Sequence, residues 1–277
     1  KGTTSCKECL PGQFIIAKTD EVGERIPLTI CDYDREKETV TIVVQTIGAG
    51  TERMMALNEG DSLEDFVDHL AAHQSFVRRI TSRRQRKSTS YLSQEVLVQL
   101  LYIHRLSGLK SMVWMLMSSW ALEIRIILFF EDEMKAVAKN LYVCTDDGSY
   151  GFHGNGSQQL QALVDAGNTY DCCVAIGPMI MMKFTCLLTK KLEIPTIVSM
   201  NPIMVDGTGM CGACRLIVDG KVKFACVDGP EFDGHLVDFD QAMKRQQQYK
   251  TEEGRAKLAY EEGATHHGGC GNCGGDK

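Results

Sequence analysis

The chain has 277 residues, of which 44% are hydrophobic and 24% are charged, and its formal net charge is −6 at pH 7. This composition is ordinary for a globular protein, and the length allows two domains with a substantial core. The acidic balance gives no reason to expect nucleic acid or an anionic membrane surface as a partner. The most apolar window, residues 111–130, is interrupted by Glu123 and Arg125, so we expect no membrane span.

Twelve cysteines are many for a chain in which no secretory signal is recognised. Three of them stand at the spacing of a metal site, which favours a reducing cytoplasm over a disulfide scaffold. Two further pairs, Cys6 with Cys9 and Cys270 with Cys273, lie near the chain ends. We give them no ligand role, because a mobile terminus is the simpler interpretation.

Residues 1–66 are predicted to form a β domain. Apolar runs bounded by turn residues predict strands over 13–17, 28–32 and 39–46. Arg25 and Thr29 lie at a strand end, and Gly48-Ala-Gly-Thr51 opens a helical stretch. A guanidinium and a hydroxyl beside a Gly-rich turn and a helix N-terminus suit a pyrophosphate. Patterns this short also occur by chance, so alone they predict little.

Residues 128–200 alternate between helices and strands. Helices are predicted over 131–140, 157–166 and 179–191, and strands over 141–145, 172–176 and 194–200. The fully apolar strand over 172–176 runs into Gly177 and Pro178, a position at which open α/β sheets bind ligands. Asp146 and Asp147 follow an earlier strand and could bind ribose hydroxyls, or simply form a solvated turn.

The strongest motif lies between residues 206 and 226. Cys211 and Cys214 form a C-x2-C pair, Cys226 follows, and Asp206 stands where the plant-type spacing C-x4-C-x2-C…C puts the first thiolate. Gly207, Gly209 and Gly212 permit the turns that a loop around a cluster needs. We interpret the motif as a [2Fe-2S] site with one carboxylate ligand. The alternatives are structural zinc, which usually shows two closely spaced pairs, and plain buried thiols.

The chain around Cys226 is predicted to form a hairpin followed by a helix. Alternating apolar residues on both sides of Asp219 and Gly220 predict two strands, with Cys226 on the second. A turn-rich segment over 229–234 and a charged helix over 239–262 follow. Residues 263–277 form a Gly-rich tail.

Together these segments resemble the ferredoxin-NADP reductase superfamily. Residues 11–14, 25–29 and 48–51 resemble its flavin-binding barrel, and residues 145–151 and 175–182 resemble later parts of its nicotinamide-nucleotide domain. The cluster motif narrows the resemblance to electron-transfer subunits related to that of dihydroorotate dehydrogenase. That subunit itself carries four cysteines. Asp in the first ligand position is instead similar to the small subunits of NADH-dependent reduced ferredoxin:NADP oxidoreductases, also called sulfide dehydrogenases.

The resemblance implies a β barrel plus α/β fold with three parts. These are a flavin-binding barrel over 1–66, a parallel-sheet NAD-binding α/β domain over 67–200, and a small [2Fe-2S] lobe with the C-terminal helix over 201–262. The chain begins late relative to the family, so about the first two barrel strands are expected to be missing. By resemblance, FAD would be held by Arg25, Pro27, Leu28, Thr29, Gly48, Gly50 and Thr51, and NAD(H) by Asp146, Asp147, Gly177 and Pro178.

The implied function is that of an electron-transfer subunit. Electrons would pass between NAD(H), FAD and the [2Fe-2S] cluster to a larger partner subunit. The resemblance implies a heterodimer whose partner carries a second flavin and [4Fe-4S] clusters and reacts with NADP(H) and ferredoxin. Two alternatives remain: the electron-transfer subunit of a dihydroorotate dehydrogenase, and a cluster-bearing interaction protein without nucleotide activity.

Residues 67–127 depart from the family, which has there a Gly-Pro-Leu-Gly turn, a strand and a Gly-Gly-x-Gly-x-x-Pro loop. This chain has a basic run over 78–87 and an apolar stretch rich in Met and Trp. Reading the third base of each codon with the first two of the next permits Gly-Pro-Leu-Gly-Cys-Pro-Ser-Glu-Phe over 67–76. It also permits Leu-Leu-Val-Ala-Gly-Gly-Val-Gly-Thr-Ala-Pro-Val-Tyr-Pro over 90–104. We therefore hypothesise that residues 67–127 are a frame-shifted translation. The alternative is a divergent insertion.

Overall fold

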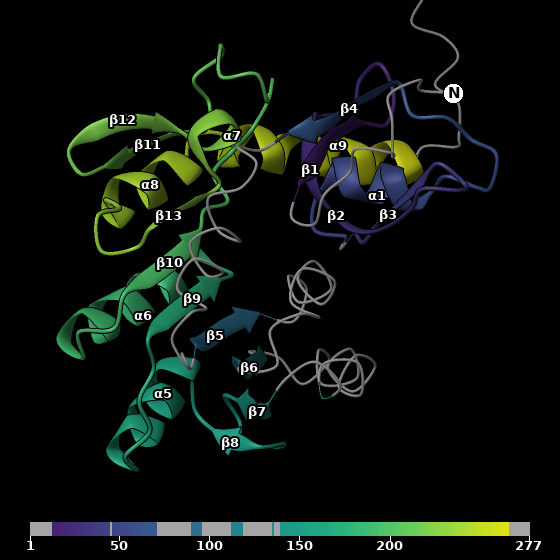
Figure 1. Ribbon diagram of the computed structural model, residues 1–277. Coiled ribbons are helices and arrows are strands. Elements are labelled where there is room, and N and C mark those ends of the chain that lie inside the picture. The colour runs from purple at the N-terminus through teal and green to yellow at the C-terminus, as the bar shows by residue number, and fades with distance from the viewer. Residues whose placement is uncertain are drawn as a thin grey trace, which may run out of the picture.

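The computed structural model describes residues 13–44, 46–70, 90–95, 112–118, 135 and 139–265. They form two main sheets and a hairpin lobe, with helices packed against them (Figure 1). Several sequence predictions lie outside the described residues: both terminal cysteine pairs, the basic run over 78–87, most of the helix over 131–140 and most of the Gly-rich tail.

The first sheet is antiparallel and contains the N-terminal part of the chain. Its order is β3-β2-β1-β4, formed by β1 (Phe14–Lys18), β2 (Ile26–Asp34), β3 (Thr39–Ile42) and β4 (Asp65–Leu70). Helix α1 (Ala49–Met55) precedes β4 in the chain. The three predicted strands and the helix after Gly48 are confirmed, whereas the sequence pattern does not predict β4. Among the described residues this sheet has four strands and does not close into a barrel.

Strand β1 is apolar on both faces, because successive side chains of a strand point to opposite sides. Ile15 and Ala17 pack in a core that includes Met54 of α1. Phe14 and Ile16, on the other face, belong to a core shared with the C-terminal lobe. β1 therefore joins the first sheet to the part of the chain that carries the cysteine motif.

The second sheet is parallel except for one edge strand. Its order is β13-β10-β9-β5-β6-β7-β8. Its strands are β5 (Ser90–Glu95), β6 (Met112–Ser118), β7 (Asn140–Thr145), β8 (Phe152–His153), β9 (Cys172–Ile176), β10 (Thr196–Ser199) and β13 (Glu231–Asp233). Helices α5 (Gly156–Asp165) and α6 (Met179–Lys191) pack side by side against it (Figure 1). The carboxyl ends of the parallel strands share one edge, where such sheets bind ligands.

The C-terminal lobe begins with a hairpin of β11 (Arg215–Val218) and β12 (Lys221–Phe224). Asp219 and Gly220 turn it with φ of 52° and 68°, as a two-residue hairpin turn of the type favoured by Asp-Gly requires. Three short or charged helices follow: α7 (Ala225–Asp228), α8 (Phe239–Gln246) and α9 (Lys250–Thr265).

Three predictions for this lobe need correction. Cys226 lies in α7, directly after β12, and not on the second strand. Residues 231–233 form β13, which pairs antiparallel with β10 and replaces part of the predicted turn. The charged helix over 239–262 is two helices, because residues 247–249 form a turn between α8 and α9.

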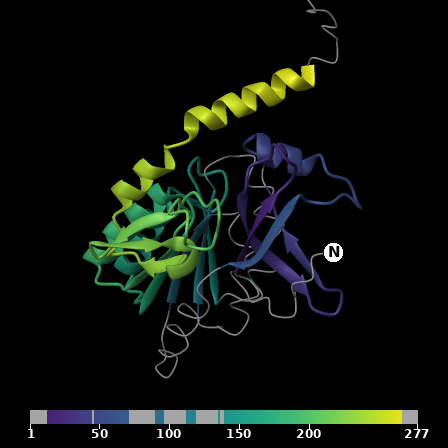
Figure 2. The same cartoon turned by 90° about the horizontal axis from the view of Figure 1, so that it is seen from above.

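Helix α9 reaches back to the first sheet and lies against α1 (Figure 2). The guanidinium of Arg53 on α1 is 5.2 Å from the centre of the Tyr260 ring and also pairs with Asp20 at 3.0 Å. The last described helix is thus tied to the N-terminal sheet. No helix in the described part of the chain is long and apolar enough to cross a membrane.

Buried hydroxyl groups connect α6 and β10 to His235. Thr196 donates to the Thr189 hydroxyl over 2.6 Å, and that hydroxyl lies 3.0 Å from Nε2 of His235. Burial is the main cause that lowers the pKa of His235 from its usual 6.5, while the charge of Asp233 opposes it and that of Lys190 adds to it.

We predict that His235→Gln reduces the decrease in the free energy of unfolding between neutral and mildly acidic pH. The folded-state pKa lies below the unfolded value of 6.5, so the unfolded state takes up the proton more readily. Native stability therefore falls as the pH drops through that value, and glutamine cannot contribute to the fall. Urea unfolding at about pH 7.5 and about pH 5.5 should show a smaller decrease for the variant than for the wild type. Equal decreases would contradict the prediction.

Candidate functional site

The loop between β10 and β11 contains three of the four predicted cluster ligands and turns repeatedly. Gly207, Gly209 and Gly212 have φ of 82°, 84° and 71°, in the left-handed region that favours glycine. A Cβ atom on Gly209 would lie 2.9 Å from Val227 of α7. The glycines thus let the loop fold closely against the helix that carries Cys226.

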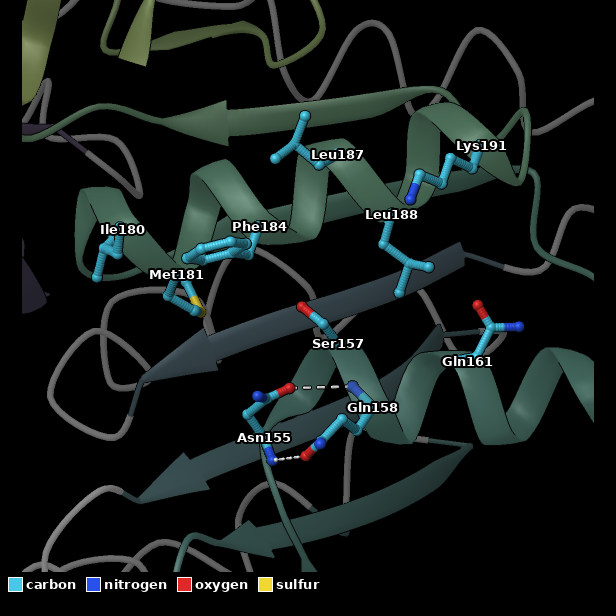
Figure 3. A pocket seen from close by; sticks show the side chains of 10 residues that line it. All are labelled: Asn155, Ser157, Gln158, Gln161, Ile180, Met181, Phe184, Leu187, Leu188 and Lys191. Carbon is cyan, nitrogen blue, oxygen red and sulfur yellow. Dashed lines mark hydrogen bonds between the residues drawn. The ribbon is translucent and has the colours of Figure 1, made fainter. Parts of the chain in front are cut away.

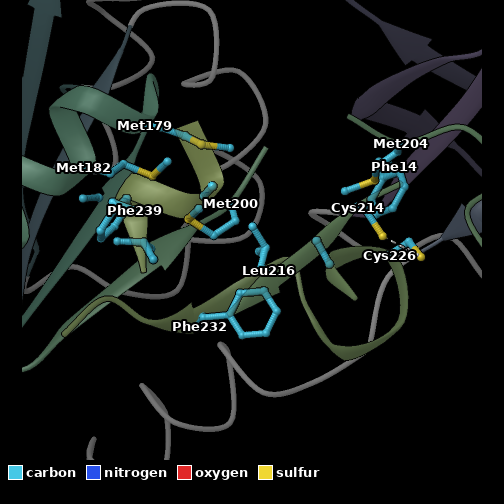
Figure 4. Packing of buried hydrophobic residues seen from close by; sticks show 14 of the residues in the cluster. Phe14, Met179, Met182, Met200, Met204, Cys214, Leu216, Cys226, Phe232 and Phe239 are labelled. Carbon is cyan, nitrogen blue, oxygen red and sulfur yellow. Dashed lines mark hydrogen bonds between the residues drawn. The ribbon is translucent and has the colours of Figure 1, made fainter. Parts of the chain in front are cut away.

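Cys214 and Cys226 come together beneath this loop. Their Sγ atoms are 3.3 Å apart, and the residues are 2% and 3% exposed. The backbone N–H of Ala225 donates to the Cys214 carbonyl over 3.2 Å, so the end of the hairpin fixes the pair. Phe14 and Met204 belong to the same buried cluster (Figure 4).

This cysteine pair suits a metal ion. Two sulfur atoms about 2.3 Å from one tetrahedral metal are about 3.8 Å apart, close to the separation of these thiols. Burial, followed by the contact with Cys214, raises the pKa of Cys226 to about 12. The metal-free chain therefore holds Cys226 as a thiol, and metal binding would release its proton.

Asp206 and Cys211 lie nearer to the solvent. The Asp206 carboxylate accepts hydrogen bonds from the hydroxyl of Thr208 and, over 3.2 Å, from its backbone N–H. The Thr208 hydroxyl is the main cause that lowers the pKa of Asp206, and the charge of Arg25 also contributes. The carboxylate is therefore ionised, as a metal ligand must be. Cys211 is exposed.

The structure brings the four predicted ligands to one loop and hairpin, but only Cys214 and Cys226 into contact with each other. Among the described residues, no three His, Cys, Asp or Glu side chains are close enough to hold a single metal ion. A two-iron cluster distributes its four ligands over two metals, so a contacting pair is the arrangement expected at one of them.

The predicted flavin positions gather where β2 and α1 begin. A Cβ atom on Gly50 would lie 2.9 Å from the Ile26 side chain, so the start of α1 lies against the start of β2. The Thr51 hydroxyl accepts from the Gly48 backbone N–H over 3.1 Å and donates to the Gly48 carbonyl over 2.9 Å. Thr51 thus stabilises the turn itself. Pro27, Leu28 and Thr29 lie on β2, opposite residues 14–16 of β1.

Arg25 makes a contact that no sequence pattern predicts. Its Nε–H donates to the Val205 carbonyl over 2.7 Å, and its Nη1 pairs with the Asp65 carboxylate. Val205 directly precedes Asp206 in the cysteine-bearing loop. Arg25 therefore connects the first sheet to the candidate metal centre.

The predicted nucleotide positions lie at the carboxyl edge of the second sheet. Gly177 and Pro178 follow β9 and border a cavity of about 440 Å³ that also involves Asn201 and Met243. Asp147 accepts hydrogen bonds from the Ser149 hydroxyl and backbone N–H, which lower its pKa, and Asp146 is exposed beside it. These hydrogen bonds within the turn are typical of a solvated turn. Asp146 and Asp147 nevertheless lie at the edge of the sheet where such folds bind ligands.

Residues 201–238 match the family model of the iron-sulfur cluster binding domain of dihydroorotate dehydrogenase B. A Thermotoga maritima protein described as a dihydroorotate dehydrogenase B (NAD(+)) electron transfer subunit homolog is 38% identical over 92% of this chain and 86% of its own length. This chain belongs to that family of electron-transfer subunits and their homologues.

Two further comparisons cover most of this chain and most of the matched protein. An uncharacterized Clostridium beijerinckii protein is 54% identical over 98% of this chain and 92% of its own length. A chain in the structure of the NADH-dependent reduced ferredoxin-NADP oxidoreductase is 35% identical, with a TM-score of 0.77 over 94% of this chain and 89% of that one. The predicted resemblance is confirmed.

Family membership also confirms the expected fold class and type of protein. The fold combines a reductase-like β domain, a parallel-sheet α/β domain and a C-terminal iron-sulfur lobe. The chain is an electron-transfer subunit of an oxidoreductase complex, and flavin, NAD(H) and an iron-sulfur cluster are the cofactors that its family and fold support.

Sequence reasoning missed an apolar groove between α5 and α6 of this electron-transfer subunit. The groove has a volume of about 550 Å³ (Figure 3). Ile180, Phe184 and Leu187 border it and are about half exposed. Their spacing along α6 is that of one helical face, a signal that could have revealed a second apolar side of this helix.

Proposed function

We propose that this chain is the flavin and iron-sulfur electron-transfer subunit of a ferredoxin:NADP oxidoreductase. The observation that carries the proposal is the buried contact between Cys214 and Cys226, within the segment that matches an iron-sulfur domain and packed against β1. When bound, FAD exchanges a hydride with NAD(H) and single electrons with a [2Fe-2S] cluster, which connects it to a larger flavoprotein partner.

In this proposal the four ligands divide into two pairs. Cys214 and Cys226 would hold one iron, because their separation suits two thiolates on one tetrahedral metal. Asp206 and Cys211 would hold the other. Cys211 is exposed and Asp206 is half-buried, so this end of the site faces outward, where a partner can receive electrons.

The flavin would lie between the first sheet and the cluster loop. Arg25, which directly precedes β2, and Pro27, Leu28 and Thr29 of β2 would hold it together with Gly48, Gly50 and Thr51 at the start of α1. Two N–H groups of Arg25 are engaged by Val205 and Asp65, and a guanidinium has five. Arg25 therefore keeps donors for a phosphate while it contacts the loop.

The nicotinamide nucleotide would bind at the carboxyl edge of the second sheet. Gly177 and Pro178 would approach the nicotinamide from the end of β9, and the cavity beside them supports this assignment. Asp146 and Asp147 would face the ribose hydroxyls. This NAD(P)H-linked activity also needs a phosphate-binding loop after β5, which the written sequence lacks and the frame-shift hypothesis supplies.

The proposal includes a partner subunit and a cellular location for the complex. The partner subunit would carry a second flavin and [4Fe-4S] clusters and react with NADP(H) and ferredoxin. We place the complex in the cytoplasm, because none of the seven cysteines whose side chains the structure describes forms a disulfide.

The direct test is to purify the chain with its partner and record visible and EPR spectra before and after adding NADH. We expect bleaching of a bound flavin and the signal of a reduced [2Fe-2S] cluster. A colourless or flavin-free protein that does not react with NADH would contradict the proposal and favour a cluster-bearing interaction protein.

A second candidate is the electron-transfer subunit of a dihydroorotate dehydrogenase, because several relatives carry that description. Asp206 speaks against it, since the resemblance assigns that subunit four cysteines. The identity of the co-purifying partner decides between them: a dihydroorotate-oxidising partner would favour the second candidate.

We predict that Asp206→Cys keeps the cluster but changes its reduction potential and EPR spectrum, because a thiolate replaces a carboxylate on one iron. Asp206→Ala should change both the potential and the EPR spectrum, or remove the cluster. Asp240→Ala removes an exposed carboxylate on α8 and is the matched control, expected to leave both unchanged. If Asp206→Ala behaves like the control, Asp206 is not a ligand.

A further inference from the structure

Arg245 on α8 reaches the turn between the two cysteines of the C-x2-C pair. Its Nη2 donates to the Ala213 carbonyl over 3.3 Å and to the Gly212 carbonyl over 3.4 Å. Both carbonyls lie between Cys211 and Cys214 in the chain. Arg245 therefore holds the backbone that presents two of the proposed ligands.

The position of Arg245 is set by the packing of α8. Phe239 of α8 is buried in the same core as Leu216 of β11 and Cys214 (Figure 4). At the start of the helix, the Asp238 backbone N–H donates to the Ile217 carbonyl over 2.9 Å. The helix is thus fixed to the hairpin that leads to Cys226, and the helix that carries Arg245 packs on the same core as Cys214 and Cys226.

Among the described residues, no carboxylate compensates the charge of Arg245. Its Nε is buried without a hydrogen-bond partner. Arg25, which contacts the other end of the loop, is paired with Asp65. A partly buried cation without a negatively charged partner is costly, so the site is suited to an anion.

A neighbouring side chain, Gln241, could explain why Nε of Arg245 has no hydrogen-bond partner. Its Oε1 lies one helical turn earlier on α8 and is also buried without a partner. A hydrogen bond between Gln241 and Arg245 would satisfy Nε, but an amide is neutral and would leave the guanidinium charge uncompensated. The excess positive charge beside the loop remains in either arrangement.

We propose that Arg245 is a positioning residue whose charge is balanced by the iron-sulfur cluster and raises its reduction potential. The inference rests on the proposed cluster site. Three thiolates and a carboxylate give the cluster a negative charge, and reduction adds one more. A nearby cation stabilises the reduced cluster more than the oxidised one, and so favours uptake of the electron.

The test is an EPR-monitored redox titration of the full chain with its cofactors. Arg245→Gln should lower the cluster potential by about 40 mV, which corresponds to about a fivefold change in the one-electron equilibrium at 59 mV per tenfold. Lys244→Gln removes the same charge from the neighbouring, exposed position on α8 and should titrate like the wild type.

A second variant keeps Arg245 and its hydrogen bonds in place. Gln241→Glu puts a carboxylate one turn away on the same helix, which compensates the guanidinium charge and should also lower the potential. Gln248→Glu adds the same charge at an exposed position just after α8 and is its control. Because the new carboxylate also acts on the cluster directly, Arg245→Lys completes the set: it keeps the charge but changes the hydrogen bonds, so it should titrate like the wild type, whereas a purely structural role predicts a shift.

The outcomes separate this inference from the proposed function. If the wild type contains no cluster, the proposed function fails. If the wild type contains a cluster but Arg245→Gln and Gln241→Glu titrate like their controls, the role of Arg245 is wrong and the cluster site stands. If Arg245→Gln loses its cluster, Arg245→Lys decides: a potential like that of the wild type supports the role of the charge, and a shifted potential contradicts it.

Discussion

Cys226→Ser is expected to remove the iron-sulfur cluster and to lower electron flow from NADH to a one-electron acceptor by about 100-fold or more. Residues that merely orient a metal ligand already change affinity or activity 10- to 100-fold, and Cys226 is proposed as a ligand itself. Its sulfur lies 3.3 Å from that of Cys214, and a serine hydroxyl is a harder and poorer ligand for an iron-sulfur centre. Bleaching of the flavin by NADH should persist, because Cys226 has no part in hydride transfer.

The matched control is Cys186→Ser. Cys186 is also a buried cysteine of the same hydrophobic cluster, and burial raises its pKa to about 12, as it does for Cys226. It lies on α6, outside the cluster loop. EPR of the dithionite-reduced proteins should show the cluster signal in the control and not in Cys226→Ser. A full signal in Cys226→Ser, or its loss in both variants, would show that Cys226 is not a specific ligand.

Local sequence signals predicted the elements whose structure is locally determined. β9 reads Cys-Cys-Val-Ala-Ile and is buried throughout, as expected for a parallel strand covered on both faces. The β11–β12 hairpin follows from the left-handed turn at Asp219 and Gly220. β13 could not be predicted in this way. It has three residues, two of them acidic, and exists because it pairs with β10.

The same distinction applies to the candidate site. The motif spacing predicted that Cys214 and Cys226 meet, because a tight hairpin joins positions only 12 residues apart. Arg25 contacts Val205 across 180 residues, and Arg245 contacts Ala213 across 32. These arginine contacts depend on how β2 and α8 pack against the loop, which no local pattern encodes. The sequence therefore revealed the proposed ligands but not the charges around them.

Strand β5 supports the frame-shift hypothesis for residues 67–127. β5 is paired on both sides, by β9 and by β6, and strands in such a position are usually continuous apolar runs. Its written sequence is Ser-Tyr-Leu-Ser-Gln-Glu. The alternative reading places Leu-Leu-Val-Ala on the same strand and begins the Gly-rich loop at its carboxyl end, near the end of β9 at Ile176.

The alignments run through this segment. The match to the Clostridium beijerinckii relative spans 98% of this chain and so includes residues 67–127. Two compensating frame shifts would preserve the length of the segment while they change its residues. Resequencing the gene tests this directly: third bases that do not spell the glycines would exclude the hypothesis.

Exchange of residues 67–127 for the corresponding segment of the Thermotoga maritima relative is expected to increase NADH affinity about 100-fold or more. Hydrogen bonds to charged groups contribute about 1.5–3 kcal/mol each, so two backbone N–H contacts to a pyrophosphate suffice for this factor. The measurement is a titration of flavin bleaching with NADH, or calorimetry for the free nucleotide. The exchange leaves the cluster lobe over 201–238 unchanged, so the EPR signal of the cluster is the internal control. Equal NADH affinities with equal cluster signals would mean that the written segment binds the nucleotide by itself, and that no shifted frame is needed to explain this part of the sheet.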